Sequence, residues 1–87
     1  MKISKVEILP IQPRQGLIGF ATLEVDEQLV LSSIAIHCKR DGSGFRLTYP
    51  TKNNGQHKMT LFHPTNLQLS REIERAIFDK AQKILIN

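Results

Sequence analysis

The chain has 87 residues and a mass of 9.9 kDa, the size of one small domain. Its 40% hydrophobic and 23% charged residues are typical of a globular protein, and the single cysteine, Cys38, excludes an internal disulfide and suits a reducing compartment. No apolar run approaches the roughly 20 residues of a membrane-spanning helix, and no signal-peptide core follows Met1, so we expect one cytoplasmic domain over 1–87 without a membrane partner.

The first two thirds of the sequence alternate apolar and polar residues with the period of a β-strand. A strand is predicted over 2–9, where Pro10 and Pro13 would end the run, and a loop follows over 11–16. The next strand is predicted over 17–26, with its apolar residues on one face.

The following strand, predicted over 29–38, changes phase. The switch falls at Ser32 and Ser33, which indicates a bulge or a strand buried on both faces. Whichever apolar pair points away from the core then needs cover, and the two pairs are Leu29 with Leu31 and Ile34 with Ile36.

Two more strands and two turns precede the helix. A glycine-rich hairpin loop over 39–44 leads to a strand over 45–49, and a polar loop over 51–56 turns at Asn54 and Gly55. A last strand is predicted over 57–62.

The C-terminal part predicts an amphipathic helix. Ser70 is the expected N-cap, and Phe78 falls nearly opposite the apolar stripe, beside Arg71 and Arg75. The stripe recurs at helical spacing and consists of Ile73, Ala76, Ile77, Ala81 and Ile84. These elements predict an α+β fold, an antiparallel sheet of about five strands packed by one C-terminal α-helix.

One helix covers only one face of such a sheet, so we expect a homodimer in which a second copy covers the other. The alternative is a bent sheet that wraps around its own helix.

The positive charge is concentrated in the middle of the sequence. The chain carries 12 basic and 8 acidic residues, a net charge of +4, and the segment 37–65 alone has five basic residues against one acidic residue. A local excess of this kind attracts polyanions through counterion release, although a solvated basic surface would look the same. We expect these cations to form one patch that spans the strand over 45–49, with Arg46 as the bridge between the loops at its two ends. The five cations are Lys39, Arg40, Arg46, Lys52 and Lys58.

No set of residues predicts catalysis, a metal or another cofactor. His37 and Cys38 are neighbours in a strand, so they point to opposite faces and cannot share a metal ion. No serine has an identifiable base, and the glycines after Asp41 fit a hairpin turn better than a phosphate loop. We expect neither enzymatic activity nor a small-molecule substrate.

From about Ile3 to Ile84 the sequence resembles the SpoVG family of bacteria (stage V sporulation protein G, septation regulators). The likeness lies in the segments ATLEVDEQLVLSSIAI and FRLTYPTK, and in HPTN followed by a helix with IERAI. The resemblance implies a small α+β domain that dimerises and binds DNA and RNA as a regulator of septation and sporulation. It points to Lys52, Lys58 and Arg71 as binding residues, while Asn53 and Ser70 stand where the family has basic residues.

The leading hypothesis is therefore a homodimeric regulator that binds DNA, with RNA as a second candidate. Phosphate contacts are expected from the five cations and from Arg71 and Arg75, and base contacts from Asn53 and Asn54. The alternative is a protein-interaction module of cell division or signalling, which would use Phe78 with Leu85, or an open strand edge, as its contact surface.

Overall fold

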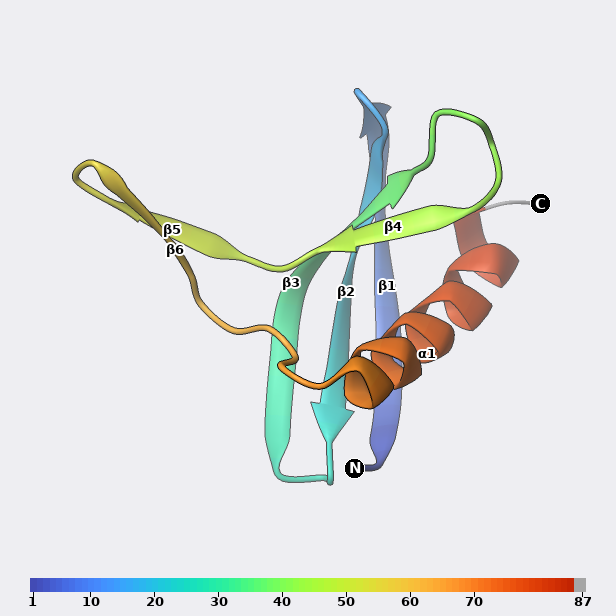
Figure 1. Cartoon of the computed structure of the whole chain (residues 1–87). Helices are drawn as coiled ribbons and strands as arrows, with labels where there is room; N and C mark the ends of the chain where they lie inside the picture. Colours follow the sequence, from blue (N-terminus) through green and yellow to red (C-terminus); the bar gives the residue numbers. More distant parts are fainter. Residues whose placement is uncertain (86–87) are drawn as a thin grey trace.

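The computed structural model describes residues 1–85. Its first four strands form one antiparallel sheet in the order β1-β2-β3-β4, and two further strands form a separate ribbon (Figure 1). The α+β class and the C-terminal helix are confirmed, while the expected sheet of about five strands is a sheet of four and a ribbon of two. The elements are β1 (Ile3–Arg14), β2 (Leu17–Val25), β3 (Leu29–Cys38), β4 (Phe45–Thr48), β5 (Thr51–Asn54), β6 (His57–Thr60) and α1 (Leu67–Leu85).

β1 continues through both of its prolines, so the prediction that Pro10 and Pro13 end the first strand is wrong. β1 is an edge strand and pairs with one neighbouring strand only. A proline is tolerated there because no strand on its other side needs the N–H that proline lacks. Pro10 lies opposite Gly19, and a Cβ on Gly19 would come within 2.9 Å of the Leu9 carbonyl oxygen. The glycine thus permits a close approach of β1 and β2, and the loop expected over 11–16 shrinks to a two-residue turn.

The bulge expected at Ser32 and Ser33 is confirmed. The register passes from Ala21 opposite Ile34 to Leu23 opposite Leu31, so two residues of β3 face one residue of β2, and Ser33 has a φ of 63°. The extra residue returns Leu31 and Ile34 to the same face, where both pack into the core. The prediction that one apolar pair of this strand points away from the core is therefore wrong.

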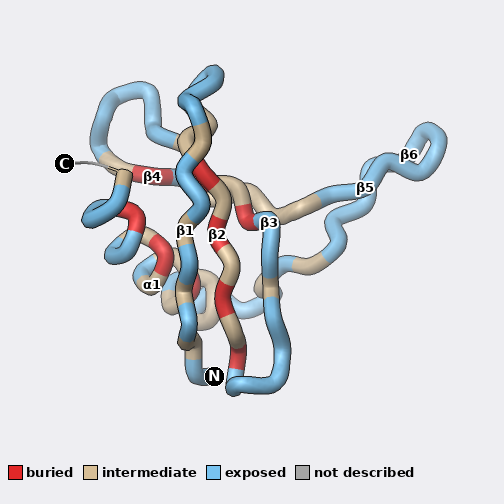
Figure 2. Tube along the Cα trace, turned by 180° about the vertical axis from the view of Figure 1, so that it is seen from behind, coloured by how far each residue is buried: buried red, intermediate tan, exposed pale blue. Residues whose placement is uncertain are grey.

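The helix α1 packs against the core face of the four-stranded sheet, and the buried positions of β2, β3 and β4 face it (Figures 1 and 2). From the predicted stripe, Ile73, Ile77 and Ala81 are buried, whereas Ile84 is 40% exposed. Among residues 1–85 the buried core consists of Ala21, Leu23, Val25, Ile34, Ile36, Phe45, Ile73, Ile77 and Ala81.

The helix starts one turn earlier than predicted and presents a broader face to the sheet. Asn66 is its N-cap, because the Asn66 Oδ1 accepts a hydrogen bond from the Leu69 N–H at 3.1 Å, so the assignment of Ser70 as the cap is wrong. Phe78 and Leu85 pack against the core, with the Phe78 and Phe45 ring centroids 5.7 Å apart. The expectation that Phe78 lies opposite the buried stripe is therefore also wrong.

No described helix covers the other face of the sheet, which we call the far face. Leu9 of β1 and Val30 of β3 are 65% and 58% exposed there, opposite Phe20 and Glu24 of β2. As expected, the single helix covers one face of the sheet and leaves the other open. The homodimer stays a prediction.

The strands β5 and β6 form a hairpin that projects away from the rest of the molecule (Figures 1 and 2). We call this hairpin, residues 51–60, the arm. Its turn at Asn54 and Gly55 is confirmed, with Gly55 at a φ of 65°, but 51–54 is a strand and the strand predicted over 57–62 ends at Thr60. Every residue of the arm is exposed.

Candidate nucleic-acid interface

The cations predicted to bind phosphate lie free of acidic side chains. Among residues 1–85 the structure has two ion pairs, Lys2 with Glu27 at 3.2 Å and Lys5 with Glu24 at 3.3 Å. Neither pair involves a predicted binding residue, so no described carboxylate lies within 4.0 Å of those seven cations. Their charge is available to a ligand.

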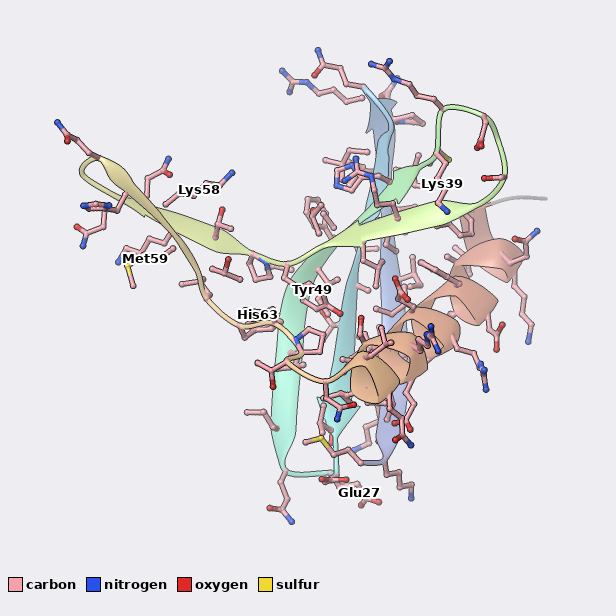
Figure 3. All side chains as sticks on the ribbon, in the orientation of Figure 1. Glu27, Lys39, Tyr49, Lys58, Met59 and His63 are labelled. Carbon is pink, nitrogen blue, oxygen red and sulfur yellow. The ribbon has the colours of Figure 1, made fainter. Side chains whose placement is uncertain are left out.

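The sequence predicted one continuous patch of cations, but the structure does not show one. Figure 3 shows Lys39 beside the loop that joins β3 and β4, and Lys58 far out on the arm. Arg46 was expected to bridge the two groups, but it lines a cavity together with Lys39 and Arg40. The structure thus separates a group at the β3–β4 end of the sheet from a group on the arm.

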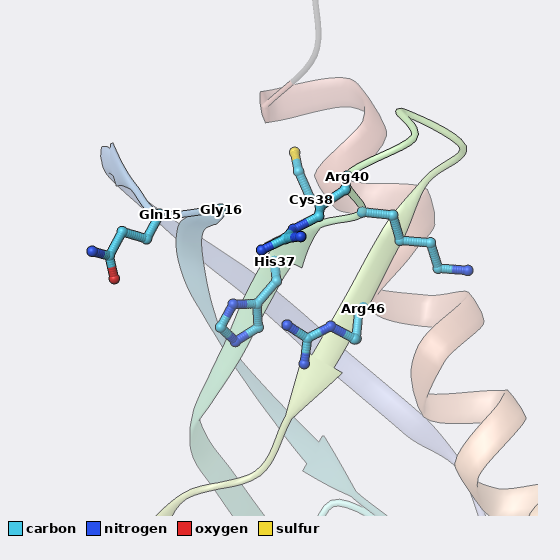
Figure 4. A pocket seen from close by; sticks show the side chains of 7 residues that line it. Gln15, Gly16, His37, Cys38, Arg40 and Arg46 are labelled. Atoms are coloured by element: carbon cyan, nitrogen blue, oxygen red, sulfur yellow. The ribbon is translucent and has the colours of Figure 1, made fainter.

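The first group surrounds a cavity of about 700 Å³, which we call the basic cavity. Its walls come from the β1–β2 turn, the end of β3, the β3–β4 loop and β4 (Figure 4). None of the described residues that line it is acidic. Its lining residues are Gln15, Gly16, His37, Cys38, Lys39, Arg40 and Arg46.

Backbone hydrogen bonds fix the two walls of the basic cavity. The Cys38 N–H donates to the Gly16 carbonyl at 2.8 Å, which ties the β1–β2 turn to the end of β3. The Lys39 N–H donates to the Gly44 carbonyl at 2.9 Å and closes the β3–β4 loop. The predicted hairpin loop over 39–44 is therefore confirmed, and it holds Lys39 and Arg40 at the cavity.

The one acidic residue of this loop is turned toward its own backbone. The Asp41 Oδ1 accepts a hydrogen bond from the Ser43 N–H at 2.9 Å. Hydrogen bonds from the Ser43 side chain and backbone lower the pKa of Asp41, and the nearby charge of Lys39 lowers it further. Asp41 thus stays ionised as part of the turn and does not pair with the cations of the cavity.

His37 is a member of this site that the sequence reasoning considered only as a metal ligand. It lies directly opposite Arg46, and its Nε2 is 2.9 Å from the Thr48 Oγ1. Burial lowers the pKa of His37, and the charge of Arg46 lowers it further. The sequence did contain information that could have identified His37. The alternation of β3 and the closure of the 39–44 loop together place residue 37 opposite residue 46, on the face of the sheet that points away from the core.

A second missed residue, Arg14, belongs to the same row across the sheet. Arg14 of β1 lies opposite Leu17 of β2, Leu17 lies opposite His37, and His37 lies opposite Arg46. Cross-strand partners share a face, so this row brings Arg14, His37 and Arg46 to the same end of the far face. Arg14 escaped the prediction because the first strand was expected to end at residue 9.

The second group lies on both faces of the arm. Lys52 lies opposite Met59, Asn53 opposite Lys58, and Asn54 opposite His57. The alternation of a strand places Asn53 and Lys58 on one face, and Lys52, Asn54 and His57 on the other. The arm therefore offers a cation and an amide side chain on each of its faces.

Arg71 and Arg75 form a third group on α1. They line a groove of about 440 Å³ together with Leu67, Gln68 and Glu72. Neither arginine lines the basic cavity. We therefore regard them as separate from the other two groups, and their expected role as flanking contacts stays a prediction.

Comparisons with known proteins give no further identification. No family model and no curated protein matches this chain. Within residues 1–85 no three His, Cys, Asp or Glu side chains gather as metal ligands do, and no described helix is long and apolar enough to cross a membrane.

Proposed function

We propose that this chain is a cytoplasmic, homodimeric regulator that binds nucleic acid by contacts alone, with no bond made or broken. The observation that carries the proposal is the set of unpaired cations, gathered in an acid-free cavity and on a projecting arm. Each phosphate that a cation neutralises releases condensed counterions, which favours binding. The resemblance to the SpoVG septation regulators supports the same function.

The shape of the arm fits a duplex. A two-stranded β-ribbon can enter the major groove of B-DNA, where amide side chains can pair with base edges. Asn53 and Asn54 lie on opposite faces of the ribbon, beside Lys58 and Lys52 respectively. We infer that the lysines position the arm on the phosphates and that the asparagines supply any base preference.

The homodimer is part of the proposal for two physical reasons. An isolated two-stranded hairpin is marginally stable in water, and Leu61, just after the arm, is 59% exposed. A partner that packs against Leu61 would stabilise the base of the arm. Two copies would also double the number of phosphate contacts on one duplex.

The experiment is a salt titration of binding to duplex DNA, single-stranded DNA and RNA of equal length, with the mass of the free protein measured in solution. We expect log Kobs to fall linearly with log salt for duplex DNA, with a slope of about −0.9 per phosphate contact. Lys52→Ala is the test variant and Lys2→Ala the control, because both remove one positive charge but Lys2 is paired with Glu27. Equal effects of the two variants, or no binding to any of the three ligands, would contradict the proposal.

The alternative function as a protein-interaction module loses one of its two expected contact surfaces, because Phe78 and Leu85 pack against the core, while the open edge of the sheet at β1 remains. The far face offers it another surface, since Leu9 and Val30 are exposed there. A chain that binds no nucleic acid at low salt would favour this alternative.

A further inference from the structure

The basic cavity differs from the rest of the charged surface because it contains a titratable group among fixed positive charges. His37 and Arg46 lie opposite each other on neighbouring strands and line this cavity together with Arg40 (Figure 4). Resting on the proposed function, we propose that this cavity holds one phosphate group of the nucleic-acid backbone and that His37 gains a proton when the phosphate enters.

The arrangement of donors fits one tetrahedral anion. Arg40 and Arg46 can each present two N–H groups to a phosphate, Lys39 adds a compact charge, and a protonated imidazole adds another donor. The volume of about 700 Å³ leaves room for a phosphate and the sugars attached to it.

The hydrogen bond of His37 allows the ring to change its charge without moving. Its Nε2 bonds to the Thr48 hydroxyl at 2.9 Å, and a hydroxyl can either donate or accept a hydrogen bond. The bond therefore persists whichever ring nitrogen takes up the proton. The orientation of the ring is the same in both protonation states.

The described charged residues around His37 are cations. Arg46 lies opposite it on β4, Lys39 and Arg40 line the same cavity, and Arg14 ends the same row of the sheet on β1. Leu17 of β2 and Gln15 of the turn are neutral, and Cys38 is the next residue on β3. The carboxylates of the far face belong to other rows. Glu7 lies opposite Thr22, and Glu24 lies opposite Val30, five and seven residues along β2 from Leu17, or roughly 17 and 23 Å at the rise of a strand.

The empty cavity therefore disfavours the protonated ring, and an anion in the cavity favours it. Without ligand, burial and the charge of Arg46 keep the pKa of His37 below 6.5. A phosphate between Arg46 and the ring offsets that repulsion and raises the pKa of His37. By linkage, the affinity is constant above the pKa of the bound state and increases as the pH falls from there to the pKa of the free state.

The test measures the His37 titration in the full chain by NMR, free and with a short oligonucleotide that lacks terminal phosphates. We expect the oligonucleotide to raise the pKa of His37, and the affinity to increase as the pH is lowered from 7.5 to 5.5, by up to about tenfold for each unit of that rise. Inorganic phosphate in place of the oligonucleotide tests whether a free phosphate occupies the same site.

Two variants separate His37 from the histidine on the arm. His37→Gln should remove the pH dependence of the affinity, because a glutamine side chain does not titrate between pH 7.5 and 5.5. His57→Gln is the matched control, since His57 lies on the arm and should leave the pH dependence intact. Thermal unfolding of each variant shows whether it is folded.

The outcomes distinguish the inference from the function on which it rests. If the oligonucleotide binds with the expected salt dependence but the pKa of His37 stays the same, the cavity holds no phosphate and the proposed function stands. If inorganic phosphate raises the pKa of His37 but no oligonucleotide binds, the cavity is an anion site and the proposed function fails. If His57→Gln abolishes the pH dependence, the proton is taken up on the arm and the inference is overturned.

Discussion

The ring of Phe45 on β4 and the ring of Phe78 on α1 pack with their centroids 5.7 Å apart and their planes tilted by 45°. Phe45 is also part of the buried core, so this pair joins the C-terminal half of the helix to the last strand of the sheet. β4 carries Arg46 on its opposite face. The aromatic pair therefore holds the strand that positions one wall of the basic cavity.

We expect Phe78→Ala to lower the free energy of unfolding by about 2 kcal/mol, less than a fully buried phenylalanine because the ring is half-buried. Urea denaturation gives the value. Leu67→Ala is the control, since Leu67 is 66% exposed, and it should cost less than about 0.5 kcal/mol. If Phe78→Ala leaves the stability unchanged but abolishes self-association, Phe78 contacts a partner and does not pack in the core.

The start of the helix gives a second prediction. Asn66→Ala removes the side-chain oxygen that accepts the Leu69 N–H, so we expect a loss of about 1 kcal/mol. Ser70→Ala lies inside the helix and should be neutral or slightly stabilising, because alanine has the higher helix propensity. Chemical denaturation of the two variants compares the positions directly, and a larger loss at Ser70 would contradict the observed cap.

The bulge in β3 gives a third prediction, which uses two adjacent serines. Ser33 has a φ of 63°, a conformation that a β-branched residue strongly disfavours, whereas Ser32 has no positive φ. Ser33→Val should therefore destabilise the chain by about 1–2 kcal/mol relative to Ser32→Val, since both serines are exposed and the side chain added is the same. Equal melting temperatures would mean that the bulge is not rigid at Ser33.

The alternation of apolar residues predicted the four main strands, the helix and the bulge because these depend on local sequence. What it missed depends on the position of a strand in the sheet. Pro10 is accepted because β1 lies at an edge, and no local signal carries that information. In the same way, the polar segment 51–54 is a strand only because 57–60 pairs with it, while both stay exposed.

The sequence predicted some residues of the candidate site, but it did not predict how they are arranged. The charge excess identified Lys39, Arg40 and Arg46, which the structure brings together, and also Lys52 and Lys58, which it places apart on the arm. A strand register that the sequence leaves open decides which cations meet. The register is also what adds His37 and Arg14 to the first group.

The arm should be dispensable for folding and necessary for affinity. Replacing residues 52–59 with Asn-Gly leaves Thr51 and Thr60 to flank a two-residue turn. Because every residue of the arm is exposed, the deletion removes no buried side chain. We expect the free energy of unfolding of the remaining domain to change by less than about 0.5 kcal/mol. Duplex binding should weaken and its salt slope should become shallower, whereas a chain that unfolds would show that the arm stabilises the domain, directly or through a partner.

The two groups of cations can be tested together through Arg46→Ala and Lys52→Ala. If each residue contacts one phosphate of the same duplex, each single variant should make the salt slope shallower by about 1 and the double variant by about 2. The separation of the basic cavity from the arm makes the two losses of binding free energy additive to within about 0.5 kcal/mol. An unchanged slope in one variant removes its group from the interface. A double variant no weaker than either single one would mean that the two groups are never engaged at the same time, and the duplex would then lie against only one of them.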